Sequence, residues 1–292
     1  GITTFDCIEF NPDLRYTDVF ADVGFLTMDL TEKGHPDLAA HFLNRYLECN
    51  GDYEGAVLLD LFFVYRCLVR AKVAAIRSRE RESEAERSAD IRDAREYSAM
   101  ARRQVARSRP VLVIMCGLSG SGKTWLAERL MAALPAIRVR SDIERKRLFG
   151  LDETAETGSG IGTGIYSPEA SAETYERLFT LADSLLAAGH NVVLDAAFLK
   201  EEQRVSARSV APSLGVDAVL VYAEAPVDVL RHRIEKRAQR KDEASEADLV
   251  VLEHQLAAAE LPRSEERALN VDTSGEPDIE GLADSILGRD RP

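Results

Sequence analysis

From residue 111 onward, short apolar runs alternate with longer stretches in which apolar residues recur every three or four positions. Each short run predicts a buried strand, and each longer stretch predicts a helix with one buried face. The predicted strands lie at residues 111–116, 137–139, 191–194, 218–222 and 268–271. Strands that alternate with helices of this length form crossover units, so we predict an α/β fold in which a five-stranded parallel sheet has helices on both faces.

The pattern differs in the first part of the chain. Residues 1–76 mix loops with helical apolar spacing and predict a mainly helical segment. Residues 77–109 are dense in arginine, glutamate and serine, and predict a long charged helix that Pro110 ends, because proline disfavours helix in the residue before it. We therefore predict three parts: a helical segment over 1–76, a linker helix over 77–109 and an α/β domain over 110–292.

Charge limits the classes of partner. The 292 residues include 50 acidic and 37 basic side chains, which gives a formal net charge of −13. This excess argues against binding to nucleic acid or to anionic lipid, and the arginines of residues 77–109 are interspersed with acids that favour a solvated helix face. No apolar run approaches the roughly 20 residues that span a bilayer, and the N-terminus lacks the order of a signal peptide. We expect no membrane association and a cytoplasmic location.

The strongest chemical motif follows the first predicted strand. It is a complete GxxxxGK[ST] pattern that opens a predicted helix, and its residues are Gly117, Leu118, Ser119, Gly120, Ser121, Gly122, Lys123 and Thr124. Glycines let backbone N–H groups turn towards a phosphate, and the positive end of the helix favours negative charge. We predict an ATP site in which Lys123 contacts the β and γ phosphates and Thr124 is a Mg²⁺ ligand.

A carboxylate follows another predicted strand. Asp195 ends the apolar run 191–194, as the carboxylate of a Walker B strand does. We predict that Asp195 anchors the metal, directly or through water. The alternative is that it serves only as a helix cap or turn residue.

Asp142 lies where a short predicted strand gives way to a helix rich in cations. Ligands of open parallel sheets bind at the carboxyl ends of strands, so Asp142 is expected near the γ-phosphate. There it could accept the proton of a substrate hydroxyl while Arg145 holds substrate or phosphate. The alternative is that Ser141 or Asp142 only caps the helix. A later basic cluster ends with Arg237 and Arg240, which suit a mobile lid over the transferred phosphate.

Several segments together resemble a group of kinases. The resemblance rests on GLSGSGKT, RSDIERKRLFG, GIYSPE, HNVVLDAAFL and RIEKRAQRKDEASEADLVVLEHQL, and it covers about residues 110–288. These segments are similar to predicted P-loop small-molecule kinases related to gluconate kinase, chloramphenicol phosphotransferase and the zeta toxins. The resemblance implies a nucleoside-monophosphate-kinase-like fold with strand order 2-3-1-4-5. By position it implies phosphate and Mg²⁺ binding by Lys123 and Thr124, a base at Asp142, a substrate anchor at Arg145, and a lid that includes Arg237 and Arg240.

The beginning of the chain resembles a different family. The segment FDCIEFN at residues 5–11 is similar to the end of an aminoglycoside-phosphotransferase-like kinase domain, in which an aspartate at the position of Asp6 holds metal. The two halves together resemble bifunctional aminoglycoside phosphotransferase/ATP-binding proteins. That family's nucleotide-binding lobe and catalytic loop would precede Asp6. We therefore expect residues 1–75 to be a helical remnant that packs on the linker helix, transfers no phosphate by itself and could associate with an upstream kinase lobe.

Two functions fit these residues. The first is an ATP- and Mg²⁺-dependent phosphotransferase that acts on a hydroxyl of a small molecule and uses Asp142 as its base. The second is an ATP-binding regulatory module that controls an adjoining kinase domain with little turnover of its own, and it has no use for a base. We predict the enzyme, with acceptor specificity in residues 148–171.

Overall fold

The computed structural model describes residues 16–106, 109–155, 157–237 and 247–288. The chain forms two compact units, of which the first consists of Gly1–His35 and Gly55–Arg107 and the second of Pro36–Glu54 and Ser108–Pro292. The domain division expected from the sequence remains a prediction, but the packing places helix α3 (Pro36–Asn50) in the second unit. Across the described ranges, every helix is too short or too polar to cross a membrane.

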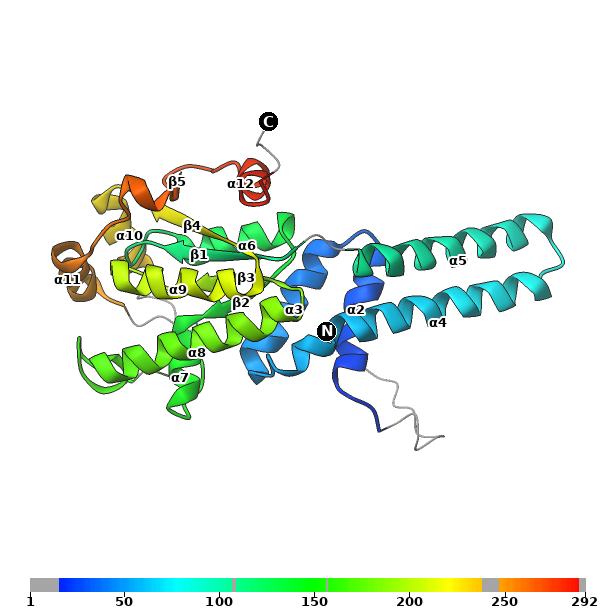
Figure 1. Cartoon of the computed structure of the whole chain (residues 1–292), viewed down its shortest axis with the longest axis horizontal. Helices are drawn as coiled ribbons and strands as arrows, with labels where there is room; N and C mark the ends of the chain where they lie inside the picture. Colours follow the sequence, from blue (N-terminus) through cyan, green and yellow to red (C-terminus); the bar gives the residue numbers. More distant parts are fainter. Residues whose placement is uncertain (1–15, 107–108, 156, 238–246, 289–292) are drawn as a thin grey trace. The chain divides into compact units, whose positions relative to one another are not determined.

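The first unit is helical. Its described helices are α2 (Phe20–Glu32), α4 (Leu59–Glu80) and α5 (Glu84–Val105), with a 3₁₀ turn at Gly55–Leu58. Helices α4 and α5 form a long hairpin (Figure 1). The buried side chains that join these helices are Met28, Phe63, Cys67, Ala71, Tyr97, Met100 and Ala101.

The hairpin differs from the single charged helix expected from residue 77 onward. Helix α4 ends at Glu80, and α5 begins at Glu84. Arg77 and Arg81 explain the break, because both donate to the buried carboxylate of Asp90 on the opposite helix, at 2.6 and 2.9 Å. In one continuous helix, Arg77 and Asp90 would be about 20 Å apart along the axis.

The second unit contains the predicted sheet. Its strands are β1 (Val111–Cys116), β2 (Ala136–Arg140), β3 (Asn191–Asp195), β4 (Asp217–Glu224) and β5 (Leu269–Asp272). All neighbouring strands are parallel, and their order is β2-β3-β1-β4-β5. The structure therefore confirms the predicted fold class and the strand order that the resemblance implied. Strand β1 is central and buried over its whole length, because its apolar side chains point towards both faces.

Helices cover both faces of this sheet (Figure 1). They are α6 (Lys123–Ala133), α7 (Ser141–Leu148), α8 (Pro168–Ala187), α9 (Glu201–Leu214) and α12 (Ile279–Ile286). The unit also contains α10 (Val227–Arg237) and α11 (Leu249–Ala258), which pack against each other, and 3₁₀ turns at Gly164–Tyr166 and Ser264–Glu266. Helices α6 and α12 share a core with Val113 and Met115 of β1. Helices α8 and α9 pack against the opposite face, so the sheet is buried between two layers.

Helix α3 covers one edge of the sheet. The side-chain amide of Asn44 donates to the carbonyl of Ala136 at 3.0 Å, and its oxygen accepts from the backbone N–H of Arg138 at 2.6 Å. The hydroxyl of Tyr53, which follows the helix, donates to the carbonyl of Arg138 at 3.4 Å. These bonds satisfy backbone groups of β2 that an edge strand otherwise offers to other chains.

A buried ion pair fastens α9 to the segment that precedes β5. Arg204 is 1% exposed, and its Nε and Nη2 donate to the two carboxylate oxygens of Glu266, each at 2.7 Å. Its Nη1 donates to the carbonyls of Phe198 and Glu260 at 3.0 and 2.7 Å. The guanidinium therefore ties together three segments around the carboxyl end of β3.

We expect Glu266→Ala to lower the free energy of unfolding by about 3–5 kcal/mol, because the Arg204 guanidinium would stay buried without its counter-charge. The hydrogen bond from Arg204 lowers the pKa of Glu266. The stabilisation is therefore present above the unfolded value of about 4.3 and is lost as the pH falls through the folded pKa. Urea unfolding at pH 7 and in acid measures both effects, with the exposed Glu265→Ala as control. A loss at pH 7 no larger than that of the control would contradict this role.

Candidate functional site

The predicted phosphate-binding loop connects β1 to α6 at the carboxyl end of the sheet. Gly120 and Gly122 have φ angles of 80° and 81°, in the left-handed region that favours glycine. A Cβ atom on Gly120 would lie 2.7 Å from the carbonyl oxygen of Leu230, so α10 leaves no room for a side chain there. The path of the loop therefore depends on Gly122, which the motif specifies, and on Gly120, which fills one of its four unspecified positions.

Arg233 of α10 supports this loop. Its guanidinium donates to the carbonyl of Gly120 at 3.2 Å and to the carbonyl of Thr273 at 2.6 Å. The Thr273 hydroxyl donates in turn to the carbonyl of Ser121 at 2.6 Å. One member of the basic cluster on α10 thus orders the loop backbone.

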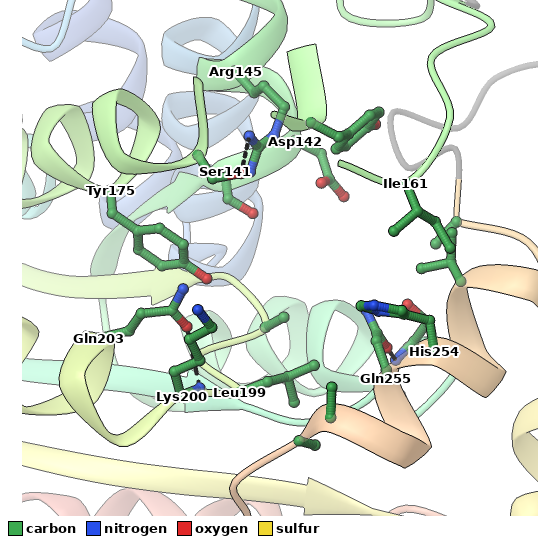
Figure 2. Close-up of a pocket in the computed structure, with 18 of the residues that line it drawn as sticks. Ser141, Asp142, Arg145, Ile161, Tyr175, Leu199, Lys200, Gln203, His254 and Gln255 are labelled. Atoms are coloured by element: carbon green, nitrogen blue, oxygen red, sulfur yellow. Dashed lines mark hydrogen bonds between the residues drawn. The ribbon is translucent and has the colours of Figure 1, made fainter. Parts of the chain in front are cut away.

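A cavity of about 350 Å³ lies beside the loop (Figure 2). Its walls come from the loop, α7, α8, α9, α11 and residues 159–162. The predicted site residues that line it are Ser119, Lys123, Thr124, Asp142, Arg145 and Asp195. The fold therefore brings together residues that the sequence presents in three separate motifs.

Lys123 is half-buried in the wall of this cavity. Burial lowers the pKa of its ammonium group, while the negative charges of Asp195 and Asp142 partly oppose that effect. The positive charge of Arg237 lowers the same pKa further. A phosphate beside Lys123 would supply negative charge to this partly desolvated ammonium group.

The Thr124 and Asp195 side chains fit a magnesium ion. The Thr124 hydroxyl donates to Oδ1 of Asp195 at 3.2 Å, and Oδ2 of Asp195 is buried without a hydrogen bond from any described residue. Hydroxyl and carboxylate oxygens are the ligands that Mg²⁺ takes alongside substrate phosphates and water. Within the described ranges no group of three or more His, Cys, Asp and Glu side chains could hold a metal, so the phosphates would complete such a site.

Asp142 lies in the first turn of α7 and is half-buried. Figure 2 shows its carboxylate directed into the cavity. The N-cap position of α7 belongs to Arg140, one residue earlier than the alternative interpretation expected. The structure therefore places Asp142 where a base could meet a ligand, and its catalytic role remains a prediction.

Arg145 lines the same cavity but is buried. Its Nη1 donates to the carbonyl of Ile165 at 3.0 Å and to the hydroxyl of Ser171 at 3.3 Å, and its guanidinium lies 5.1 Å from the centre of the Tyr166 ring. Its buried Nε has no hydrogen-bond partner among the described residues. Arg145 thus orders the 165–171 segment and keeps one donor for a further partner.

The two predicted lid arginines differ in what the structure shows. Arg237 ends α10, and its Nη2 donates to the carbonyl of Ala247 at 2.5 Å. Its charge acts on Lys123, although its side chain does not line the described cavity. Arg240 lies outside the described residues.

Gln255 of α11 is a site residue that sequence reasoning missed. Its Oε1 accepts from the backbone N–H of Ser119 in the phosphate-binding loop at 2.8 Å. Val251, His254 and Ala258 of the same helix also line the cavity. These residues are spaced three or four positions apart and therefore share one face of α11. That spacing is the feature of the sequence that could have identified them.

The parallel sheet with strand order β2-β3-β1-β4-β5 and the glycine loop between β1 and α6 define a P-loop domain. Residues 112–262 match the family model described as AAA domain, which is more than half of the chain. The chain belongs to this family.

Related proteins are longer than this chain. Uncharacterized proteins of Mycobacterium tuberculosis and Mycobacterium bovis are 32% identical to it over 240 residues, which cover 82% of this chain and 47% of each relative. The chain thus spans about half the length of these relatives.

Among solved structures, a gluconokinase from Sinorhizobium meliloti superposes with a TM-score of 0.43 and 22% identity, and the match covers 63% of this chain and 94% of that one. The Mycobacterium tuberculosis APS kinase in complex with AMPPNP and APS gives a TM-score of 0.44 and 23% identity, with 62% and 98% covered.

Proposed function

We propose that the second unit is an ATP- and Mg²⁺-dependent phosphotransferase that moves the γ-phosphate of ATP to a hydroxyl of a small molecule. One observation carries the proposal: a single cavity is lined by Lys123, by the Thr124–Asp195 pair and by Asp142. A module that only binds nucleotide needs the first two features. It has no use for a carboxylate directed into the cavity.

In this reaction, Asp142 accepts the proton of the acceptor hydroxyl. The hydroxyl oxygen forms a bond to the γ-phosphorus while the bond between that phosphorus and the ADP oxygen breaks. Lys123 balances the negative charge of the phosphates. Thr124 and Asp195 hold Mg²⁺, which when bound neutralises charge on the phosphate oxygens. Positioning and electrostatic stabilisation supply most of the catalysis in this class of reaction.

The remaining predicted residues complete the proposed site. Arg145 anchors the acceptor, and Arg237 and Arg240 cover the transferred phosphate as part of a lid. Outside the site, we propose that residues 1–76 are the tail of an aminoglycoside-phosphotransferase-like domain, as in bifunctional aminoglycoside phosphotransferase/ATP-binding proteins. In this proposal the tail transfers no phosphate, associates with an upstream kinase lobe and belongs to a cytoplasmic protein.

Mass spectrometry of a cell metabolite extract incubated with the protein, ATP and Mg²⁺ tests this function. We expect a new phosphorylated species with the parent protein and none with Lys123→Ala or Asp142→Ala. The mass and fragmentation of that species identify the acceptor. If calorimetry shows ATP binding and yet no product forms, the ATP-binding regulatory module becomes the favoured function.

A further inference from the structure

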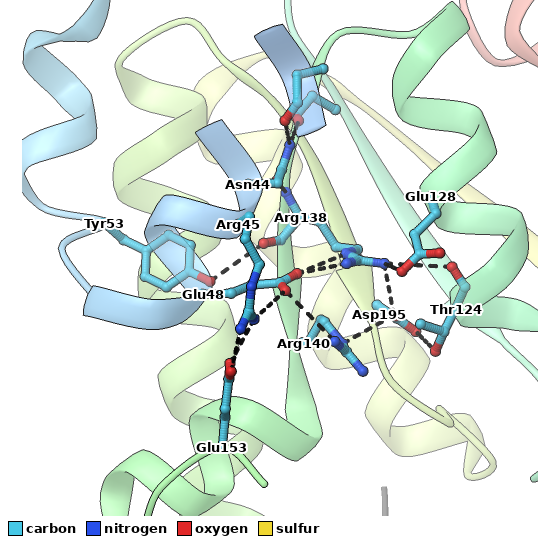
Figure 3. A network of polar contacts seen from close by, with 12 residues as sticks. Asn44, Arg45, Glu48, Tyr53, Thr124, Glu128, Arg138, Arg140, Glu153 and Asp195 are labelled. Carbon is cyan, nitrogen blue, oxygen red and sulfur yellow. Dashed lines mark hydrogen bonds and ion pairs between the residues drawn. The ribbon is translucent and has the colours of Figure 1, made fainter. Parts of the chain in front are cut away.

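Glu48 of α3 lies outside the residues that match the AAA domain model and contacts two arginines of β2, Arg138 and Arg140. Its carboxylate is 3% exposed and lies among guanidinium groups (Figure 3). A buried charge is costly unless it is paired, so the groups that surround it indicate what it does.

Two arginines of β2 share this carboxylate. Arg138 donates Nε and Nη2 to Oε1 of Glu48 at 3.1 and 2.7 Å, and Nη1 of Arg140 lies 3.6 Å from Oε2. Arg45, one turn earlier on α3, lies 3.8 Å from the same Oε2. On its other side Arg138 donates to Glu128 at 3.2 Å. Glu48 is therefore the carboxylate that Arg138 and Arg140 have in common on the side facing away from the nucleotide loop.

Both guanidinium groups stop short of Asp195. Oδ2 of Asp195 lies 4.0 Å from Nη1 of Arg138 and 3.9 Å from Nε of Arg140. These distances exceed the roughly 2.7–3.2 Å of a hydrogen bond, and Oδ2 accepts none from the described residues. Hydrogen bonds between a guanidinium and a carboxylate are short and strong, so the bonds of Arg138 to Glu48 compete with any bond to Asp195.

We propose that Glu48 is this competing anion and acts as a positioning residue. It draws Arg138 and Arg140 away from Asp195, so that one carboxylate oxygen stays available for the cation. It also orients Arg140, whose side chain lines the cavity. The inference rests on the proposed function for the identity of the cation and of the nucleotide.

The attachment of α3 fixes the position of Glu48. Asn44, one turn earlier, bonds to the backbone of β2 on both sides of Ile137. Tyr53 bonds to the same strand after the helix has ended. The carboxylate therefore approaches Arg138 from a helix that is bonded to the same strand as the arginine.

Isothermal titration calorimetry of the full chain with a non-hydrolysable ATP analogue tests the proposal. Each protein is titrated with and without Mg²⁺, and the measured quantity is the gain in affinity that Mg²⁺ brings. We expect Glu48→Gln to lower this gain by about 10–100-fold, because the arginines then neutralise Asp195. The metal-free affinity should not fall, since the site becomes more positive. A general loss of structure would instead weaken binding in both titrations.

The control is Glu153→Gln, which removes the partner of Arg45 and leaves the bonds of Arg138 and Arg140 in place. It should match the parent protein. If Glu48→Gln does not fold, Glu48→Asp is used instead, because its side chain is one methylene shorter and holds the carboxylate farther from the arginines. The same selective loss of the Mg²⁺ gain is expected. An undiminished Mg²⁺ gain in the Glu48 variant would overturn this inference alone. Absence of nucleotide binding by the parent protein would overturn the proposed function as well.

Discussion

Asp142→Ala is expected to slow phosphoryl transfer by about 10²–10⁴-fold while the affinity for ATP stays nearly unchanged, because a general base acts only on the acceptor hydroxyl. The structure supports this split, since Asp142 is directed into the cavity from α7 while the phosphate-binding loop lies between β1 and α6. Single-turnover kinetics with the identified acceptor measures the rate, and calorimetry measures the affinity.

The matched control is Asp152→Ala, which removes an exposed carboxylate from the segment after α7. It should leave both quantities at the level of the parent protein. If Asp142→Ala weakens ATP binding as much as Lys123→Ala does, Asp142 belongs to the nucleotide site and its role as base is wrong.

Lys123→Ala is expected to lower the rate of transfer by about 10²–10³-fold or more, and to weaken ATP binding strongly, because the phosphates lose their buried cation. The same residue predicts a pH dependence. Burial lowers the pKa of Lys123, so its charge is lost before the pH reaches the ordinary lysine value of about 10.4. ATP affinity should therefore fall as the pH rises through this lowered pKa.

Calorimetry over a series of alkaline pH values checks this second effect. The Lys123→Ala protein should show no decline of its own in that range. Lys200→Ala removes an exposed cation from the wall of the same cavity and serves as the control. A parent protein whose affinity stays constant up to the ordinary lysine value would show that Lys123 does not bind the phosphates as a cation.

Local patterns made the core of the site predictable. The phosphate-binding motif needs particular residues at a fixed spacing, and Asp195 directly follows a run of apolar residues that is typical of a buried strand. Crossover connections then force the carboxyl ends of parallel strands to one edge of the sheet. These three facts place Lys123, Asp142 and Asp195 at the edge of the sheet where the cavity lies.

Contacts between segments that are far apart in the sequence could not be predicted from local patterns. Gln255 bonds to Ser119 across 136 residues, and Asn44 bonds to Arg138 across 94. A single amide side chain on a helix produces no periodic signal for such a contact. The break between α4 and α5 has the same origin, since Asp90 joins two arginines only after the hairpin has closed.

The bonds between α3 and β2 also determine which fragment of the chain can be expressed as the P-loop unit. A segment that starts at Pro110 retains the family motif but leaves β2 with an uncovered edge and two arginines without their shared carboxylate. An uncovered edge strand is a template for aggregation. An expressed fragment must begin before Pro36 to keep this edge covered, and during synthesis α3 leaves the ribosome well before the strand that it covers. The second unit is therefore built from two separate stretches of chain, Pro36–Glu54 and Ser108–Pro292, which are synthesised at different times.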